Sequence, residues 1–351
     1  MALSMPEAVT SPIAEAITAL VASTDLGTVA SVEPLPASGN NRAFRVETQS
    51  RVILVKRYFT HPSDPRNRLD TEFRFTIYAD AAAPGSVPRP IARHDAEQLA
   101  AYEFIDGAPF CPGEVTAKDV DAAIDFFAAL NTPDARRRAD GLPMASEAVF
   151  SLVEHIQLVD RRLSVLFTVN PEGLGDAAAL IRRLVDDWRS LVDRILRLAE
   201  DRGLSVDDAL KTDHRCVSPS DFGFHNALQR RGGGIVFHDF EYAGWDDPTR
   251  MLGDFFAQPA VPVPSDGFAE FLRRCVALFP AAALLDQRAA LMRPIYLAKW
   301  CCIALGVFVP LTLERRKFAN PALDEAKIKK KQIAIAASLH EALRKVSHEL
   351  H

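Results

Sequence analysis

Residues 218–239 read SPSDFGFHNALQRRGGGIVFHD, and this stretch decides how the rest of the sequence is interpreted. Three glycines stand between two short apolar segments, and Gly-Gly is a strong signal for a β-hairpin turn, because such turns need positive φ angles. If Gly232 and Gly233 form the turn, counting outward places Asn226 opposite Asp239. Directly opposed Cα atoms in an antiparallel pair lie roughly 4.5 to 5.5 Å apart. The sequence therefore predicts that a carboxamide and a carboxylate meet at the open end of a hairpin.

An asparagine and an aspartate in this arrangement suit a magnesium site. Mg²⁺ takes one or two protein side-chain oxygens and fills its other positions with water and phosphate. Either residue alone is better explained as a turn former. Asp221 changes this balance, because it precedes Asn226 by five residues in a segment that Pro219 keeps from being helical. Kinase catalytic loops separate their catalytic aspartate from a metal-binding asparagine by the same interval.

Two segments, SPSDFGFHNAL and VFHDFEYAGWDDP, together resemble the C-terminal lobe of the aminoglycoside phosphotransferase and choline kinase-like family. The family pattern is H-G-D-x-x-x-x-N, a hairpin, D-W/F-E and then G-D-P. This resemblance implies that Asp221 is the catalytic aspartate and that Asn226 and Asp239 bind Mg²⁺. The letters DFG at 221–223 are then not the metal-binding motif that they form in protein kinases. The resemblance also implies transfer of the γ-phosphate of ATP to a hydroxyl group of a small molecule.

Three positions of the catalytic segment depart from the family pattern. Pro219 and Ser220 stand where the family has His and Gly, and His225 stands where Gly is common. Because of Pro219, a kinase-like binding or scaffold protein that holds nucleotide without turnover is one alternative to a kinase. A metal-dependent phosphohydrolase is another, because His214 and His238 also lie near Asp221 in sequence. No H-x-H or H-x-x-x-H spacing supports that second alternative.

The N-terminal part offers the phosphate-binding residues that a kinase requires. Such an enzyme needs a lysine on a strand and a glutamate on the next helix. Lys56 lies in the predicted strand VILVKRY, and Glu72 lies in the helix predicted over 70–82. Alone, Lys56 would be interpreted as an exposed edge residue and Glu72 as a helix-surface carboxylate. Their order in the chain favours the functional pair.

Two further segments are assigned by the resemblance. The loop 37–44 (ASGNNRAF) occupies the place of the phosphate-covering loop, with Ser38 and Asn40 as candidate phosphate contacts. An ordinary β-turn explains those two residues equally well. In YEFIDG, the backbone near Phe104 and Ile105 occupies the place of the hinge that meets adenine.

The pattern of the whole chain predicts two lobes. The first hundred residues are rich in strands, including a hairpin from 42–46 and 51–58, whereas the remainder shows mostly helical periodicity. The helix over 70–82 is expected to turn Phe73 and Ile77 inward. We therefore predict an α+β, bilobal protein-kinase-like fold. Its N-terminal antiparallel sheet lobe with one main helix, 1–106, binds ATP, and its larger, mainly helical lobe, 107–351, carries the catalytic loop, the metal site and the acceptor site.

Composition limits the partners and the compartment. The chain has 351 residues, of which 25% are charged, and a net charge of -5, so it lacks the basic footprint of a nucleic-acid-binding protein. Its five cysteines include no C-x-x-C pair, which favours a reduced, cytoplasmic protein. The most apolar segment, 295–311, contains Lys299 and is too short to span a bilayer, so a buried core helix is expected. No membrane partner is expected, and the oligomeric state stays open.

The acceptor is the least determined part of the prediction. Glu241 and Asp246 lie in an acidic stretch with Asp247 and Asp254, and carboxylates there would suit an amine-bearing substrate. An amino-sugar, a sugar or an amino alcohol is therefore the expected class of hydroxyl compound. The alternative is structural: the two aspartates before Pro248 stabilise a turn.

Overall fold

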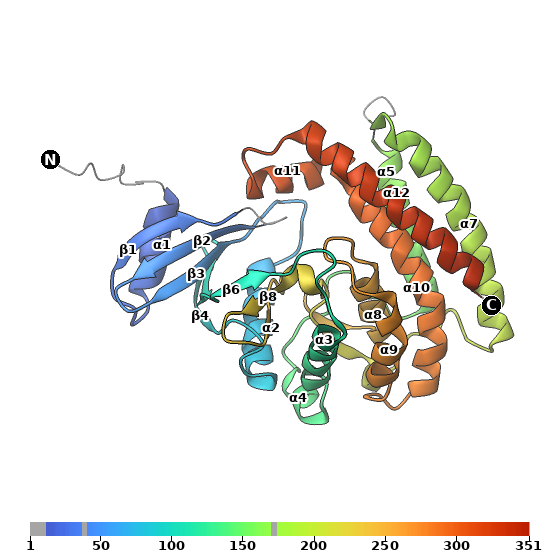
Figure 1. Cartoon of the computed structure of the whole chain (residues 1–351), viewed down its shortest axis with the longest axis horizontal. Coiled ribbons are helices and arrows are strands. Elements are labelled where there is room, and N and C mark those ends of the chain that lie inside the picture. The colour runs from blue at the N-terminus through green and yellow to red at the C-terminus, as the bar shows by residue number, and fades with distance from the viewer. Residues whose placement is uncertain (1–11, 37–40, 170–173, 351) are drawn as a thin grey trace.

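The computed structural model describes residues 12–36, 41–169 and 174–350. These residues form a small sheet lobe and a larger helical lobe (Figure 1). The sheet is antiparallel, with strand order β1-β2-β3-β5-β4. The elements of this lobe are α1 (Pro12–Ala22), β1 (Val29–Pro34), β2 (Arg42–Thr48), β3 (Val52–Arg57), α2 (Arg68–Ala82), β4 (Pro90–His94) and β5 (Leu99–Glu103). The predicted hairpin is confirmed as β2 and β3.

The helical lobe also contains two small sheets, in which β7 pairs with β10 and β8 lies between β6 and β9. Its strands are β6 (Gly107–Pro109), β7 (Cys216–Ser218), β8 (Ala227–Arg230), β9 (Ile235–Phe237) and β10 (Gly244–Asp246). Its α-helices are α3 (Ala117–Leu130), α4 (Pro133–Arg138), α5 (Leu152–Phe167), α7 (Ala177–Asp201), α8 (Pro248–Ala257), α9 (Phe268–Val276), α10 (Ala282–Leu305), α11 (Pro310–Ala319) and α12 (Glu325–Glu349). Short 3-10 turns occur at η1 (Thr212–His214), η2 (Phe224–Asn226), η3 (Ser265–Gly267) and η4 (Gly306–Phe308).

The five-stranded sheet is covered on both faces. Successive side chains of a strand point to opposite faces, so Ile53 and Val55 of β3 pack with α1, which buries Ile17 and Leu20 against them. Lys56 is on the other face, toward α2. The alternation of β3 therefore carries one basic residue into a buried position beside α2.

The inward face of α2 is more polar than the sequence suggested. Phe75 is fully buried, but Ile77 is 52% exposed, so the expectation that Ile77 points inward is wrong. Glu72 and Thr76 occupy the buried face instead, with Glu72 only 3% exposed. The pattern of apolar residues gave the wrong inward face for α2, because a charged residue of the site, Glu72, occupies one of its buried positions.

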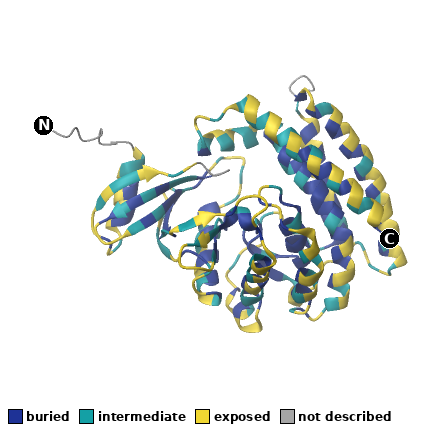
Figure 2. Ribbon diagram, viewed as in Figure 1, coloured by how far each residue is buried: buried dark blue, intermediate teal, exposed yellow. Residues whose placement is uncertain are grey.

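The apolar helix α10 lies inside the helical lobe. It packs against α5, α8 and α12, and its C-terminal half, 291–305, is mostly buried, as the dark blue along this helix in Figure 2 shows. Among the described residues, Ala282–Phe308 is long and apolar enough to cross a membrane by length and composition, with a mean hydropathy of 1.4, yet 72% of its apolar window is buried inside the protein. The prediction of a core helix is confirmed, although the helix starts earlier and continues through Pro294.

Candidate active site

A buried lysine connects the two lobes. The Nζ atom of Lys56 donates to both carboxylate oxygens of Glu72, each at 2.8 Å, and also to Asp239 of the helical lobe. The phenol of Tyr58 donates to Glu72 at 2.8 Å and lies 2.9 Å from the phenol oxygen of Tyr102. These phenols, which no sequence motif singles out, orient the Glu72 carboxylate. The structure thus brings together the predicted residues Lys56, Glu72 and Asp239.

Negative charge exceeds positive charge around this lysine. Burial opposes the ammonium ion of Lys56, but Asp239 and Glu72 more than offset that effect, so its pKa is raised. Burial raises the pKa of Glu72 to about 7, although Lys56 acts to lower it. One ammonium group faces two carboxylates here, and Asp221 is close enough to act on the pKa of Asp239. A divalent cation would balance this excess.

The hairpin register differs by one residue from the prediction. Ala227 pairs with Phe237, so the loop holds three residues, and Asn226 faces His238, whose backbone N–H donates to the Asn226 carbonyl at 2.9 Å. The run of three glycines offers several equivalent positions for the turn, which is why counting failed. Gly233 and Gly234 both adopt positive φ, 94° and 87°.

Asp239 follows the hairpin with an unusual backbone. Its φ is 69°, a left-handed value that costs a non-glycine residue roughly 1–3 kcal/mol where the surrounding structure enforces it. Such conformations cluster at functional sites. With this backbone the Asp239 side chain meets Lys56 at the open end of the hairpin despite the shifted register.

The catalytic segment holds Asp221 and Asn226 together. The Asn226 amide nitrogen donates to the backbone carbonyl of Asp221 at 2.9 Å and lies 3.3 Å from its Oδ2. His225 Nε2 lies 3.1 Å from Asp221 Oδ1. Burial acts to raise the pKa of Asp221, but His225 and Asn226 together lower it, so this carboxylate is ionised near neutral pH. An ionised carboxylate can accept the proton of an acceptor hydroxyl.

The donor set fits a hard cation. Because the amide nitrogen of Asn226 is used inside the loop, its oxygen is directed elsewhere, and Asp239 has a second carboxylate oxygen beyond the one that meets Lys56. Two oxygen donors with remaining positions for water and phosphate are what Mg²⁺ requires. Within the described part of the chain, no three His, Cys, Asp or Glu side chains gather into a metal site. His214 pairs with Asp213 at 3.6 Å, so the phosphohydrolase alternative gains no support.

Asp246 lies in a buried ion pair with Arg250. It is 1% exposed and pairs with Arg250 at 2.9 Å, and burial raises its pKa to about 6. Its neighbour Asp247 caps α8 through the backbone N–H of Thr249 at 2.7 Å. This geometry favours the structural alternative for both aspartates, and a contact of Asp246 with an amine-bearing substrate stays a prediction. Arg250 also donates to the hydroxyl of Ser220 at 3.5 Å, which links this buried network to the catalytic segment.

Glu241 is likewise turned inward. It is 2% exposed, accepts from the Asn41 amide at 2.8 Å and lies 3.4 Å from Arg68 Nε. This contact joins the sheet lobe to the helical lobe, because Asn41 immediately precedes β2. The Glu241 carboxylate thus has partners inside the protein, as Asp246 does, and its contact with the acceptor stays a prediction.

The remaining predicted residues are those that the resemblance assigns to contacts with the nucleotide. Ser38 and Asn40 lie outside the described residues. Phe104 and Ile105 lie between β5 and β6, where the chain passes from one lobe to the other. Ile105 is buried, and the guanidinium of Arg45 lies 5.8 Å from the ring centre of Phe104.

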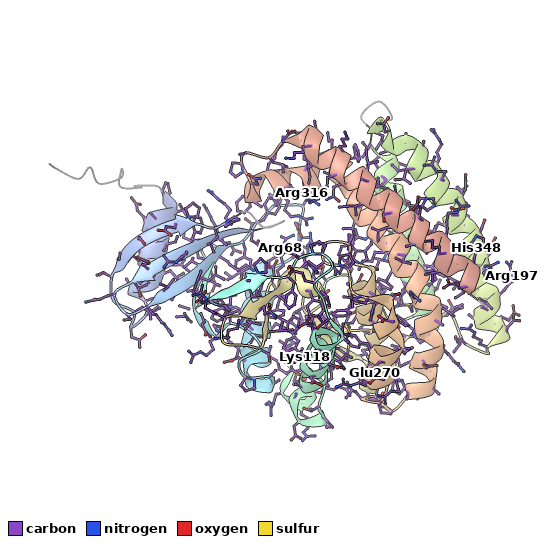
Figure 3. All side chains as sticks on the ribbon, in the orientation of Figure 1. Arg68, Lys118, Arg197, Glu270, Arg316 and His348 are labelled. Carbon is purple, nitrogen blue, oxygen red and sulfur yellow. The ribbon has the colours of Figure 1, made fainter. Side chains whose placement is uncertain are left out.

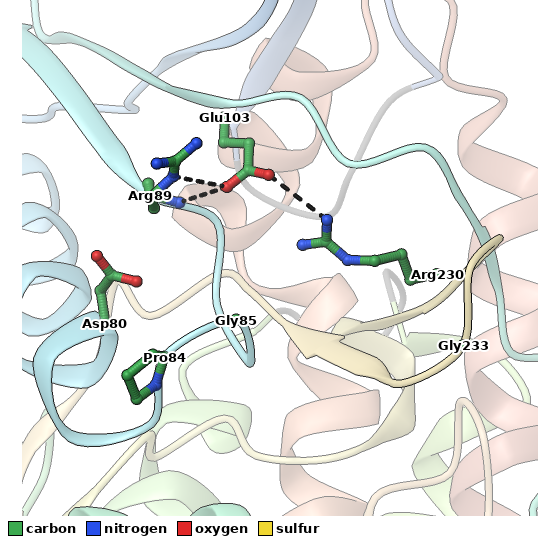
Figure 4. Close-up of a pocket in the computed structure, with 7 residues that line it drawn as sticks. All are labelled: Asp80, Pro84, Gly85, Arg89, Glu103, Arg230 and Gly233. Carbon is green, nitrogen blue, oxygen red and sulfur yellow. Dashed lines mark hydrogen bonds and ion pairs between the residues drawn. The ribbon is translucent and has the colours of Figure 1, made fainter.

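A separate cavity of about 690 Å³ lies beside this connection (Figure 4). Figure 4 shows Glu103 pointing toward Arg89 and Arg230, and the ion pairs measure 3.4 and 3.5 Å. None of the residues that line the cavity is a predicted site residue, so it is distinct from the catalytic constellation. Its lining consists of Asp80, Pro84, Gly85, Arg89, Glu103, Arg230 and Gly233.

Comparisons with known proteins agree on the architecture. Neither a family model nor a curated protein matches the sequence. The fold, however, matches solved structures over nearly the whole chain. The chain has the fold of the small-molecule kinases. The predicted bilobal α+β fold is confirmed.

Three solved structures illustrate the similarity. A choline/ethanolamine kinase family protein from Mesorhizobium loti is 19% identical, with a TM-score of 0.58 over 96% of this chain and 98% of its own. A spectinomycin phosphotransferase, solved with ADP and spectinomycin, is 12% identical, with a TM-score of 0.57 over 93% and 98%. A choline kinase from Streptococcus pneumoniae is 16% identical, with a TM-score of 0.56 over 93% and 100%.

Proposed function

We propose that this protein is an ATP- and Mg²⁺-dependent phosphotransferase that moves the γ-phosphate to a hydroxyl group of a small molecule. The observation that carries the proposal is the convergence of Lys56, Glu72 and Asp239 at the junction of the lobes, with Asp221 close enough to Asp239 to act on its pKa. A lysine, a helix glutamate, a metal aspartate and a catalytic aspartate are the parts that phosphoryl transfer requires. The fold shared with choline kinases and a spectinomycin phosphotransferase supports the same reaction class.

Each residue has a defined task in this mechanism. Lys56, held by Glu72, binds the α and β phosphates, and Asn226 and Asp239 would hold Mg²⁺, which when bound would supply positive charge to offset that of the phosphate oxygens. Asp221 orients the acceptor hydroxyl and takes its proton. The bond between the γ-phosphorus and the bridging oxygen of ADP breaks, and a bond to the acceptor oxygen forms. Most of the rate enhancement comes from positioning and charge stabilisation.

The alternative of a binding or scaffold protein rests on Pro219. That residue replaces the family histidine. Within the catalytic segment, however, His225 contacts Asp221, and Arg250 of α8 contacts Ser220, so the segment has other means of being held. All five cysteines are free, which agrees with the proposal of a cytoplasmic enzyme.

The test is incubation with γ-labelled ATP and Mg²⁺ and a panel of hydroxyl compounds, with label counted separately in organic product and in inorganic phosphate. We expect transfer to an organic acceptor, and the Asp207→Asn variant, altered at an exposed position, should retain it. ATP that binds tightly but is never transferred would favour the scaffold alternative.

A further inference from the structure

Two arginines of α11, Arg315 and Arg316, have no ionic partner within the described ranges. No carboxylate there forms an ion pair with either guanidinium, and the Nε atom of each is buried without a hydrogen-bond partner among those same residues. Burial and then the neighbouring Arg315 lower the pKa of Arg316. Partly buried cations of this kind are costly unless something compensates them.

These arginines lie close to the catalytic constellation. The rings of Phe318 on α11 and Phe59, which follows β3, meet at 5.3 Å, so α11 packs against the sheet lobe. Arg315 is also close enough to Tyr242 to act on its pKa, and Tyr242 is three residues beyond the metal-binding Asp239. Figure 3 labels Arg316 on α11 and Arg68 at the start of α2.

Tyr242 connects α11 to the start of α2. The guanidinium groups of Arg66 and Arg68 lie 5.4 and 5.9 Å from the ring centre of Tyr242. Arg66 and Arg68 share the carboxylate of Asp64 at 2.6 and 2.7 Å, and Arg68 also approaches Glu241. The positive charges at the start of α2 are therefore balanced inside the protein.

A second set of ion pairs lies near Asp221, the proposed catalytic residue. Lys299 donates to both oxygens of Asp254 at 2.8 and 3.0 Å, and Arg162 pairs with Glu147. Lys299 also acts on the pKa of Asp221, so this set adjoins the point of phosphate transfer. These charges are paired, whereas Arg315 and Arg316 form no ion pair within the described residues, and the Nε atom of each is buried without a hydrogen-bond partner there.

We propose that the phosphate acceptor carries a carboxylate or a phosphate group, which Arg315 and Arg316 bind while its hydroxyl faces Asp221. The inference rests on the proposed function and names the substrate class for the same site. Guanidinium groups pair with carboxylate and phosphate through two parallel hydrogen bonds, so adjacent arginines suit either anion. A cationic acceptor would meet unbalanced positive charge at the same place. The amine-bearing class suggested by Glu241 and Asp246 is thereby replaced.

The first test works before the acceptor is identified. A small-molecule cell extract is separated by anion exchange at pH 8 into retained and unretained fractions, and each is incubated with the protein and γ-labelled ATP. Glycerate and glycerol 3-phosphate, tested against glycerol and choline, distinguish a carboxylate from a phosphate. We expect labelled organic product from the retained fraction or from the anionic compounds. Transfer confined to unretained compounds, or to none, overturns the inference.

The second test uses the double variant Arg315→Gln/Arg316→Gln with the best accepted anionic compound, and Arg183→Gln on the exposed face of α7 as the control. Hydrogen bonds to charged groups contribute enough that their loss should raise the acceptor KM about tenfold or more. The KM for ATP and the kcat should each change less than about threefold, which corresponds to less than half of the free-energy difference of a tenfold change. An unchanged acceptor KM, or a raised KM for ATP instead, overturns the role of these arginines. If Asp221→Asn also leaves transfer unchanged, the proposed function itself has failed.

Discussion

Lys56 of β3 and Asp239 of the helical lobe form an ion pair, so a single buried ammonium group joins the sheet lobe to the helical lobe. The two residues are 183 positions apart in the chain. Under the proposed function, their contact means that the residues assigned to the nucleotide and to the metal are held by one relationship between the lobes.

Replacing Lys56 should selectively weaken phosphate recognition. In Lys56→Met the ammonium group is lost while the length of the side chain is nearly kept, so we expect the Kd for Mg-ATP to rise about tenfold or more, because hydrogen bonds to charged groups are worth about 1.5–3 kcal/mol. Affinity for adenosine, which has no phosphate, should change little. Calorimetry with both ligands checks this, and Arg57→Met on the opposite face of β3 is the control. Equal loss of both affinities would indicate general unfolding of the lobe.

Ser220 tests the backbone of the catalytic segment. Its φ is 66°, which glycine adopts freely and β-branched residues resist. Ser220→Gly should therefore retain transfer and alter the free energy of unfolding by less than about 1 kcal/mol. Ser220→Val should cost about 1–3 kcal/mol and reduce transfer by displacing Asp221. Urea unfolding and transfer rates measured on both variants check the prediction, and equal behaviour of Gly and Val would contradict it.

Asp247 tests the buried network beneath the site. Its carboxylate meets Arg288 at 2.7 Å and His155 at 3.2 Å, all three side chains being buried. Asp247→Asn leaves Arg288 without its charged partner and should lower the free energy of unfolding by about 3–5 kcal/mol at pH 7. Asp266→Asn, at an exposed position, should cost almost nothing.

The effect of Asp247→Asn should depend on pH in a defined direction. Burial acts to raise the pKa of Asp247, but Arg288 and His155 outweigh it, so the folded-state pKa lies below the ordinary value of 3.8. A lowered pKa stabilises the folded state above the unfolded-state value, and that contribution is lost as the pH falls through the folded-state value. The difference between wild type and variant should thus be constant from about pH 5 to 7 and shrink below about pH 4. A difference that grows in acid would contradict this assignment.

The sequence predicted the local elements well and their exact alignment less well. Alternation identified β3 and placed Lys56 in it, and the interval from Asp221 to Asn226 singled out two residues that the fold brings into contact. The register failed because three successive glycines can turn in more than one place. The inward position of Ile77 failed because the buried face of α2 is occupied by charged residues whose partners are far away in sequence.

The acceptor side was harder for a similar reason. Acidic residues in sequence suggested a cation site, but Glu241 and Asp246 are neutralised by Arg68 and Arg250, which only the folded structure brings to them. Charge counted along the chain does not reveal which charges remain unpaired. Arg315 and Arg316 became significant only once the surroundings of their guanidinium groups in the described part of the fold were visible.

The central claim assigns different tasks to two aspartates, and comparing Asp221→Asn with Asp239→Asn tests it most directly. Mg²⁺-dependent ATP affinity and single-turnover phosphate transfer are measured for each variant. Asp221→Asn should bind Mg-ATP normally and slow transfer by about 100- to 10,000-fold, the range of general acid–base catalysis. Asp239→Asn should weaken Mg-ATP binding by at least about tenfold, a loss seen even for outer partners of metal sites. Wild-type transfer by Asp221→Asn, or unchanged Mg-ATP affinity in Asp239→Asn, would contradict the account.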